Sequence, residues 1–250
     1  MMRKFTEPLG FAPVDTPDPM LTIDTDDPIT KRAGDDLAED AAQRLAMEEQ
    51  AATLLGAFFA AQLVRLQAEV AKTQALDSFW RAEQATTLRA VLPLWDTVLA
   101  EASAAGAAQM AIGVEWGSVN QAVLKLARAE AARLATQLTD TSKAQAAQII
   151  ADWIQDGGTL DELTARLARI YPEARAKLIA ATEVTRLYAV GNKAAWDASD
   201  VVTGYTWKTA RDERVCPMCG ALYNQRFDKG DTTVPPAHPG CRCWIVPEVD

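Results

Sequence analysis

All the soft metal ligands of this 250-residue chain lie in one short C-terminal stretch, between Cys216 and Cys243. Around these two ends the sequence reads V-C-P-M-C-G, then a polar loop, then P-P-A-H-P-G-C-R-C-W. The stretch contains all four cysteines, Cys216, Cys219, Cys241 and Cys243, and the single histidine, His238. Such a concentration of thiols and imidazole indicates that these side chains act together.

The spacing of the first two cysteines predicts a metal site. Zinc is held by Cys thiolates and His nitrogens in a tetrahedral shell, and structural sites typically draw two ligands from a C-x2-C turn. Cys216 and Cys219 have this spacing, and Pro217 between them suits a tight turn. We therefore expect zinc, bound as a structural ion.

Five candidate ligands compete for four positions. We favour a shell of three cysteines and His238, in which either Cys241 or Cys243 is the spare. The alternative is a shell of all four cysteines with His238 outside. Because ligands are in excess, the shell is expected to be closed, whereas a catalytic zinc keeps an open position.

Other interpretations of the cysteines carry less weight. Two disulfides are disfavoured because a reducing cytosol keeps thiols free, and the first residues lack the apolar core of a secretory signal. Unconnected buried thiols are a further alternative. Iron in a shell of four thiolates is a weaker choice of metal.

Charge and hydropathy exclude some classes of protein. The net charge is −9, and residues 1–50, with 12 acidic and 5 basic side chains, account for −7 of it. A uniformly basic face is therefore absent, which weakens a simple DNA-binding interpretation. No uninterrupted apolar run approaches the about 18 residues of a membrane span, so we expect a protein without a span, located in the cytosol or assembled from it.

The pattern predicts a mainly α chain with a small β-rich module, in three parts. Residues 1–34 form an acidic, proline-interrupted arm, because such a segment cannot bury enough apolar surface to offset its chain entropy. Residues 35–139 form long amphipathic helices. Residues 140–250 form a further helical part that ends in a metal-binding tail at 201–250.

Several boundaries follow from caps and breakers. We expect one helix from Asp35 to about Thr73, a second over 85–104 that Pro93 kinks or splits, and a turn over 102–113. Capping boxes at Ser118, Ser142 and Thr159 predict three separate helix starts. Pro172 suits the first position of a helix over 172–198, and short strands are expected at 201–203, 205–209, Phe227 and 244–246.

The helix over 172–198 carries one candidate ion pair. Glu183 and Arg186 are three residues apart, so they share a face of the helix. The pair is either a solvated surface contact or a clamp between this helix and the metal module.

Four segments of the C-terminal part match a family pattern. They are Thr182-Glu183-Val184-Thr185-Arg186, Trp207, Asp212-Glu213-Arg214-Val215-Cys216-Pro217-Met218-Cys219 and Pro235-Pro236-Ala237-His238-Pro239-Gly240-Cys241-Arg242-Cys243. On these residues, the region over roughly 140–247 resembles the phage Mu F-like minor head proteins, also called head morphogenesis proteins. The resemblance implies a virion component of a tailed phage or prophage-derived particle, inside the head or at the portal vertex. It also implies portal or capsid proteins as partners, with packaged DNA as a further candidate, in assembly, packaging or delivery.

Two other functions compete with a non-enzymatic assembly protein. A metal-dependent nuclease rests on the ligands and on spare acids such as Glu213. It lacks a recognisable catalytic motif, and the single histidine is assigned to the metal. A DNA-binding zinc module would contact phosphates through the basic side chains of the tail, which are Lys208, Arg211, Arg214, Arg226 and Arg242.

Overall fold

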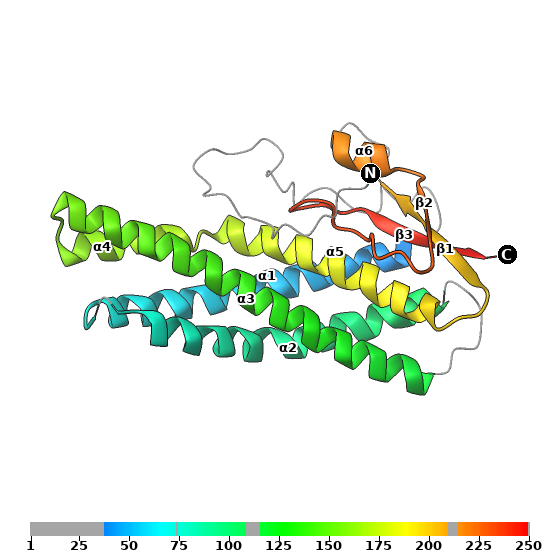
Figure 1. Cartoon of the computed structure of the whole chain (residues 1–250), viewed down its shortest axis with the longest axis horizontal. Helices are drawn as coiled ribbons and strands as arrows, with labels where there is room; N and C mark the ends of the chain where they lie inside the picture. Colours follow the sequence, from blue (N-terminus) through cyan, green and yellow to red (C-terminus); the bar gives the residue numbers. More distant parts are fainter. Residues whose placement is uncertain (1–37, 74, 109–115, 210–214, 250) are drawn as a thin grey trace.

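The computed structural model describes residues 38–73, 75–108, 116–209 and 215–249, and the arm predicted for 1–34 lies outside them. Figure 1 shows the long helices lying alongside one another, with a small sheet at one end. The elements in chain order are α1 (Ala38–Val70), α2 (Asp77–Ala108), α3 (Trp116–Asp156), α4 (Leu160–Leu167), the 3-10 turn η2 (Ala168–Ile170), α5 (Glu173–Asp197), β1 (Val202–Lys208), α6 (Pro217–Leu222), β2 (Arg226–Asp228) and β3 (Trp244–Val249).

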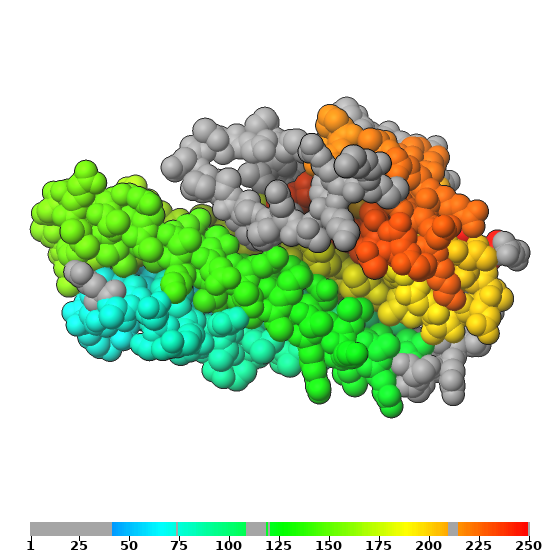
Figure 2. Space-filling view, viewed as in Figure 1, coloured from blue at the N-terminus to red at the C-terminus, as the bar shows by residue number. Residues whose placement is uncertain are grey.

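This architecture confirms a mainly α chain with a small β module near the C-terminus. The three strands form one antiparallel sheet in the order β2-β1-β3. Figure 2 shows the segment that carries the sheet as a lobe at one end of the helical body. We call residues 202–249 the C-terminal lobe.

Helix α5 is the most enclosed of the helices, because α1 and α2 pack along it and β3 touches it. Its apolar positions, such as Ile179, Val184 and Leu187, are fully buried in the central core. The same helix contributes Trp196 to a second core, which it shares with the lobe. One helix thus joins the two cores.

Helix α2 differs from the prediction in extent. It begins at Asp77 rather than near residue 85, and it runs through Pro93 as one helix to Ala108. Val91 and Trp95, on either side of the proline, are both completely buried. Their packing outweighs the local cost of the missing backbone hydrogen bond. The turn expected over 102–113 is therefore wrong for 102–108, and 109–113 lie outside the described residues.

Helix α3 replaces two predicted helices with a single helix of 41 residues. The break was expected at Ser142, whose side chain was assigned a capping role. In the structure Ser142 is buried in mid-helix, and its hydroxyl accepts a hydrogen bond of 3.2 Å from the guanidinium of Arg175 on α5. A tertiary partner thus takes the place of the cap.

The capping box at Thr159 is confirmed. Its hydroxyl accepts from the backbone N–H of Glu162 at 3.3 Å, and its own N–H donates to the Glu162 carboxylate at 2.7 Å. Pro172 lies one position earlier than predicted, as the N-cap of α5. This cap fixes where the enclosed helix begins.

The sheet forms where the sequence predicts it, except that two of the predicted strands are one continuous strand. The two expected strands around Gly204 are one strand, β1, with an irregular register between Val202 and Gly204. A Cβ atom on Gly204 would lie 2.4 Å from the carbonyl oxygen of Phe227, so only glycine allows β2 to approach here.

By length and composition alone, α1 could cross a membrane over Ala42–Val70. The expectation of a chain without a span concerned uninterrupted apolar runs, and charged residues such as Glu49 and Arg65 interrupt this segment. One third of that segment is buried in the protein, and core helices of soluble proteins can have the same length and composition. In the structure α1 packs on α2 and α5, and it also carries the buried charged residues Arg44 and Glu48.

Helices α2 and α5 cross at very short range through small residues. A Cβ atom on Gly191 of α5 would lie 2.7 Å from the Cβ of Ala102 and 3.2 Å from the carbonyl oxygen of Leu99. On α2, a Cβ atom on Gly106 would meet the backbone of Asn192 at 2.8 Å. The crossing therefore requires glycine on both helices.

We predict that Gly191→Ala lowers the free energy of unfolding by about 1–3 kcal/mol, because the added methyl forces the two helices apart. Urea denaturation measures this change. The control is Gly56→Ala in α1, where no atom lies within 4 Å of the added carbon. That variant should gain about 0.5–1 kcal/mol from the better helix former. Equal stability of Gly191→Ala and the native chain would contradict the close crossing.

Candidate metal centre

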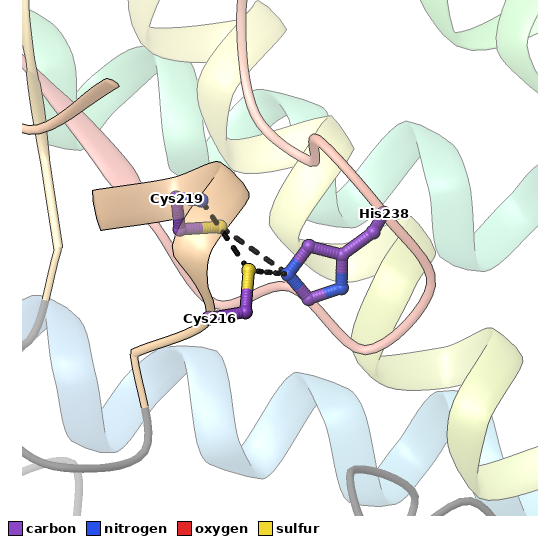
Figure 3. Close-up of side chains that lie close together, drawn as sticks. All are labelled: Cys216, Cys219 and His238. Carbon is purple, nitrogen blue, oxygen red and sulfur yellow. Dashed lines mark hydrogen bonds between the residues drawn. The ribbon is translucent and has the colours of Figure 1, made fainter. Parts of the chain in front are cut away.

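The first ligand pair is presented by the start of α6. Cys216 is the N-cap of this short helix, and its sulfur accepts a hydrogen bond of 3.3 Å from the backbone N–H of Cys219. Pro217 occupies the first turn, where its missing N–H costs nothing. The turn directs both sulfur atoms to the same side, as Figure 3 shows.

His238 faces this pair from the loop before β3 (Figure 3). Its Nε2 atom lies 3.2 Å from the sulfur of Cys216 and 3.2 Å from that of Cys219. The other ring nitrogen, Nδ1, lies 2.8 Å from the carbonyl oxygen of Pro239. Because a carbonyl oxygen only accepts, Nδ1 carries the proton, and Nε2 keeps its lone pair for a metal.

A second group overlaps the first. The ligand atoms of Cys219, Cys241 and Cys243 lie within 4.8 Å of one another, as do those of Cys216, Cys219 and His238. Cys219 belongs to both groups, and its sulfur lies 3.7 Å from that of Cys241. With Zn–S bonds of about 2.3 Å, a tetrahedral shell separates its sulfur atoms by about 3.8 Å. The spacing thus fits two thiolates on one ion.

The structure therefore gathers the five predicted side chains into two groups of three that share Cys219, and each group could hold a metal ion. All four cysteines are described, and all are free. The disulfide interpretation does not fit, because the sulfur of Cys219 lies at a ligand distance from that of Cys241 rather than at a bonded one. Unconnected thiols do not fit either, since every cysteine belongs to one of these two groups.

The thiols perturb one another strongly where they are buried together. Hydrogen bonds from Cys219 and Cys243 lower the pKa of Cys241 far below its usual value. The pKa of Cys219 is raised, first by its hydrogen bond to Cys241 and then by that to Cys243. The three buried thiols therefore titrate together, as one group.

The lobe surrounds the cysteines with apolar side chains. Cys219, Cys241 and Cys243 belong to the same buried cluster as Trp207 and Ile245, which come from β1 and β3. The hydroxyl of Tyr205 on β1 lies 3.0 Å from the carbonyl oxygens of Asp231 and Thr233, in the loop that leads to His238. The sheet thus holds the chain segments from which the ligands project.

Glu183 of α5 is buried rather than solvated, so the surface interpretation of its pair with Arg186 is wrong. The two side chains approach to 3.8 Å, and Arg133 of α3 forms a shorter ion pair with the same carboxylate. Burial raises the pKa of Glu183, while the charges of Arg133 and Arg186 act in the opposite direction. Arg133 was not anticipated, because nothing in the sequence relates residues 133 and 183.

The contacts between the lobe and the helices include two that sequence reasoning missed. Arg242 donates to the carboxylate of Glu48 on α1 at 2.6 Å. The backbone N–H of Gly240 donates to the hydroxyl of Thr182 on α5 at 2.9 Å. Residues other than Glu183 and Arg186 thus make these contacts between the helices and the lobe. Each contact spans more than fifty residues of sequence, so local pattern carries no signal for it.

Comparison with protein-family models matches residues 144–246 to the family described as Phage Mu protein F like protein. This match confirms the resemblance seen in the sequence. The matched segment includes α5, β1, β2, the first residues of β3 and all five candidate ligands, whereas α1 and α2 lie outside it. Neither the curated proteins nor the solved structures gave a match.

We predict that Cys216→Ser lowers zinc affinity by more than the about 10–100-fold typical of a change outside the ligand shell. The lobe should also lose its cooperative melting, because binding energy at such a site is folding energy. Elemental analysis of the purified chain and calorimetry measure the two effects. Met218→Ala is the control, since this neighbouring side chain is 47% exposed. Unchanged zinc content in Cys216→Ser would remove it from the shell.

Proposed function

We infer that this chain, whose residues 144–246 belong to the phage Mu protein F-like family, is a structural minor head protein of a tailed phage or prophage-derived particle. It works with the portal in head assembly, DNA packaging or DNA delivery. The family match is the observation that carries the inference. The protein is a component of the virion, in the capsid interior or at the portal vertex, after assembly in the host cytoplasm.

We propose that the lobe binds one structural zinc ion. Cys216, Cys219 and His238 supply three ligands, and Cys241 or Cys243 supplies the fourth. The protonated Nδ1 of His238 and the spacing of the sulfur atoms support this choice. When bound, zinc crosslinks α6, the loop at His238 and the start of β3. A lobe of this size has too small a core to hold its shape without such a link.

The lobe and the long helices have different roles in this proposal. The lobe is fixed by its ligands, while the long helices offer extended faces to portal or capsid proteins. Exposed apolar side chains on these helices, such as Val64 on α1 and Leu124 on α3, support a role in contacts with partners. We therefore assign recognition of the particle to the helices.

The two alternatives receive less support. In a DNA-binding module the tail cations would face phosphate, yet Arg242 is 19% exposed and pairs with Glu48, and Lys208 donates to Asn224. In a nuclease the metal would need an open coordination position, whereas the two overlapping groups offer five candidate ligands, enough to close a tetrahedral shell. Glu213, the acid considered for that role, lies outside the described residues.

We predict that the tagged chain co-purifies with portal protein from cells producing particles, and that purified particles contain it. Mass spectrometry of the eluate and of the particles measures both. The double variant Val64→Glu with Leu124→Glu should lose the association, because these exposed apolar side chains lie on the helices to which we assign contacts with partners. Met218→Ala should keep it. A proteome of intact particles that lacks this chain would overturn the assignment.

A further inference from the structure

The segment from Gly240 to Cys243 faces in two directions. Cys241 and Cys243 turn their side chains into the buried core of the lobe, where their sulfur atoms join that of Cys219. Arg242, between them, points the other way and reaches Glu48 on α1. In an extended segment neighbouring side chains alternate in direction, so the placement of the two cysteines and that of the arginine are coupled.

The contact with α1 is close and largely withdrawn from water. The Nη2 atom of Arg242 lies 2.6 Å from Oε2 of Glu48, and its Nε lies 3.3 and 3.2 Å from the two carboxylate oxygens. The side chain of Glu48 is 8% exposed and that of Arg242 is 19% exposed. Both nitrogens of the fork engage the carboxylate, a geometry that fixes orientation as well as distance.

A second contact holds the same segment from the other side. The N–H of Gly240 donates to the hydroxyl of Thr182, which is fully buried on α5. Gly240 has a φ of +73°, and a Cβ atom there would lie 3.2 Å from a methyl group of Leu178 on α5. The turn at Gly240, immediately before Cys241, therefore packs directly on α5.

We propose that Glu48 and Thr182 are positioning residues for the metal centre, so that metal binding and the docking of α1 on the lobe stabilise each other. This proposal rests on the zinc site proposed above. Glu48 acts through Arg242 on the two flanking cysteines, and Thr182 acts through Gly240 on Cys241. Since α1 lies outside the family-matched segment, this contact ties the metal centre to the helices that precede that segment.

The first test measures zinc affinity of the full chain by competition with a chromogenic chelator. We expect Glu48→Ala to lower the affinity by about 10–100-fold, the range for residues that orient metal ligands. Glu48→Gln, which keeps an acceptor for Arg242, should lose less. Glu49→Ala is the matched control, because it removes the same charge from an exposed position next along α1. It should leave the affinity unchanged.

A charge exchange separates orientation from general damage to the fold. The double variant Glu48→Arg with Arg242→Glu should recover at least part of the affinity lost in Glu48→Ala. Circular dichroism shows whether each variant keeps its helices.

Thr182→Val removes the hydroxyl at nearly constant volume, and it should weaken zinc binding with the helices intact.

The reverse effect is required by linkage, because two coupled events must stabilise each other equally. Chelating the metal should therefore speed hydrogen exchange in α1 around Glu48. Helix α4, at the far end of the body, serves as the internal control and should not respond.

The outcomes distinguish this proposal from the one on which it rests. A native chain that binds neither zinc nor the spectroscopic probe cobalt overturns both. Tight zinc binding by the native chain together with unchanged affinity in Glu48→Ala and Thr182→Val overturns the positioning role alone. The same holds if chelation leaves exchange in α1 unaltered, or if the charge exchange recovers nothing while the helices stay intact.

Discussion

The burial of α5 is the constraint on which the rest of the structure depends. A helix enclosed on most sides must have neighbours for nearly every face, and α1, α2 and strand β3 of the lobe supply them. Small residues such as Ala180, Ala181 and Gly191 let these neighbours approach. Because α1 and α2 lie outside the family-matched segment, the most enclosed helix of that segment is covered by residues from beyond it.

The sequence predicts those features that local chemistry determines. The C-x2-C turn and His238 were found because ligand type and spacing are visible in a few residues, and the box at Thr159 was found for the same reason. Pro93 and Ser142 were misread, because each is a local signal that packing or a distant partner overrides. Sequence spacing likewise does not decide whether Cys241 or Cys243 is the fourth ligand, since both sulfur atoms lie near that of Cys219.

The lobe combines two sources of cohesion. Its sheet is small, and its core includes three of the cysteines themselves, packed with Trp207, Tyr205 and Ile245. Trp196 extends this core into α5 and donates its indole N–H to the carbonyl oxygen of Gly106 on α2 at 2.9 Å. These cysteines are therefore both candidate metal ligands and part of the apolar core, so a substitution at one of them would change the metal site and the packing together.

The unbroken course of α3 has a consequence for assembly. At 1.5 Å of rise per residue, its 41 residues extend about 60 Å. Figure 1 shows the α3–α4 hairpin at one end of the molecule and the sheet at the other. Two large binding partners could occupy these ends simultaneously without steric conflict. A partner bound at one end would therefore leave the other end accessible.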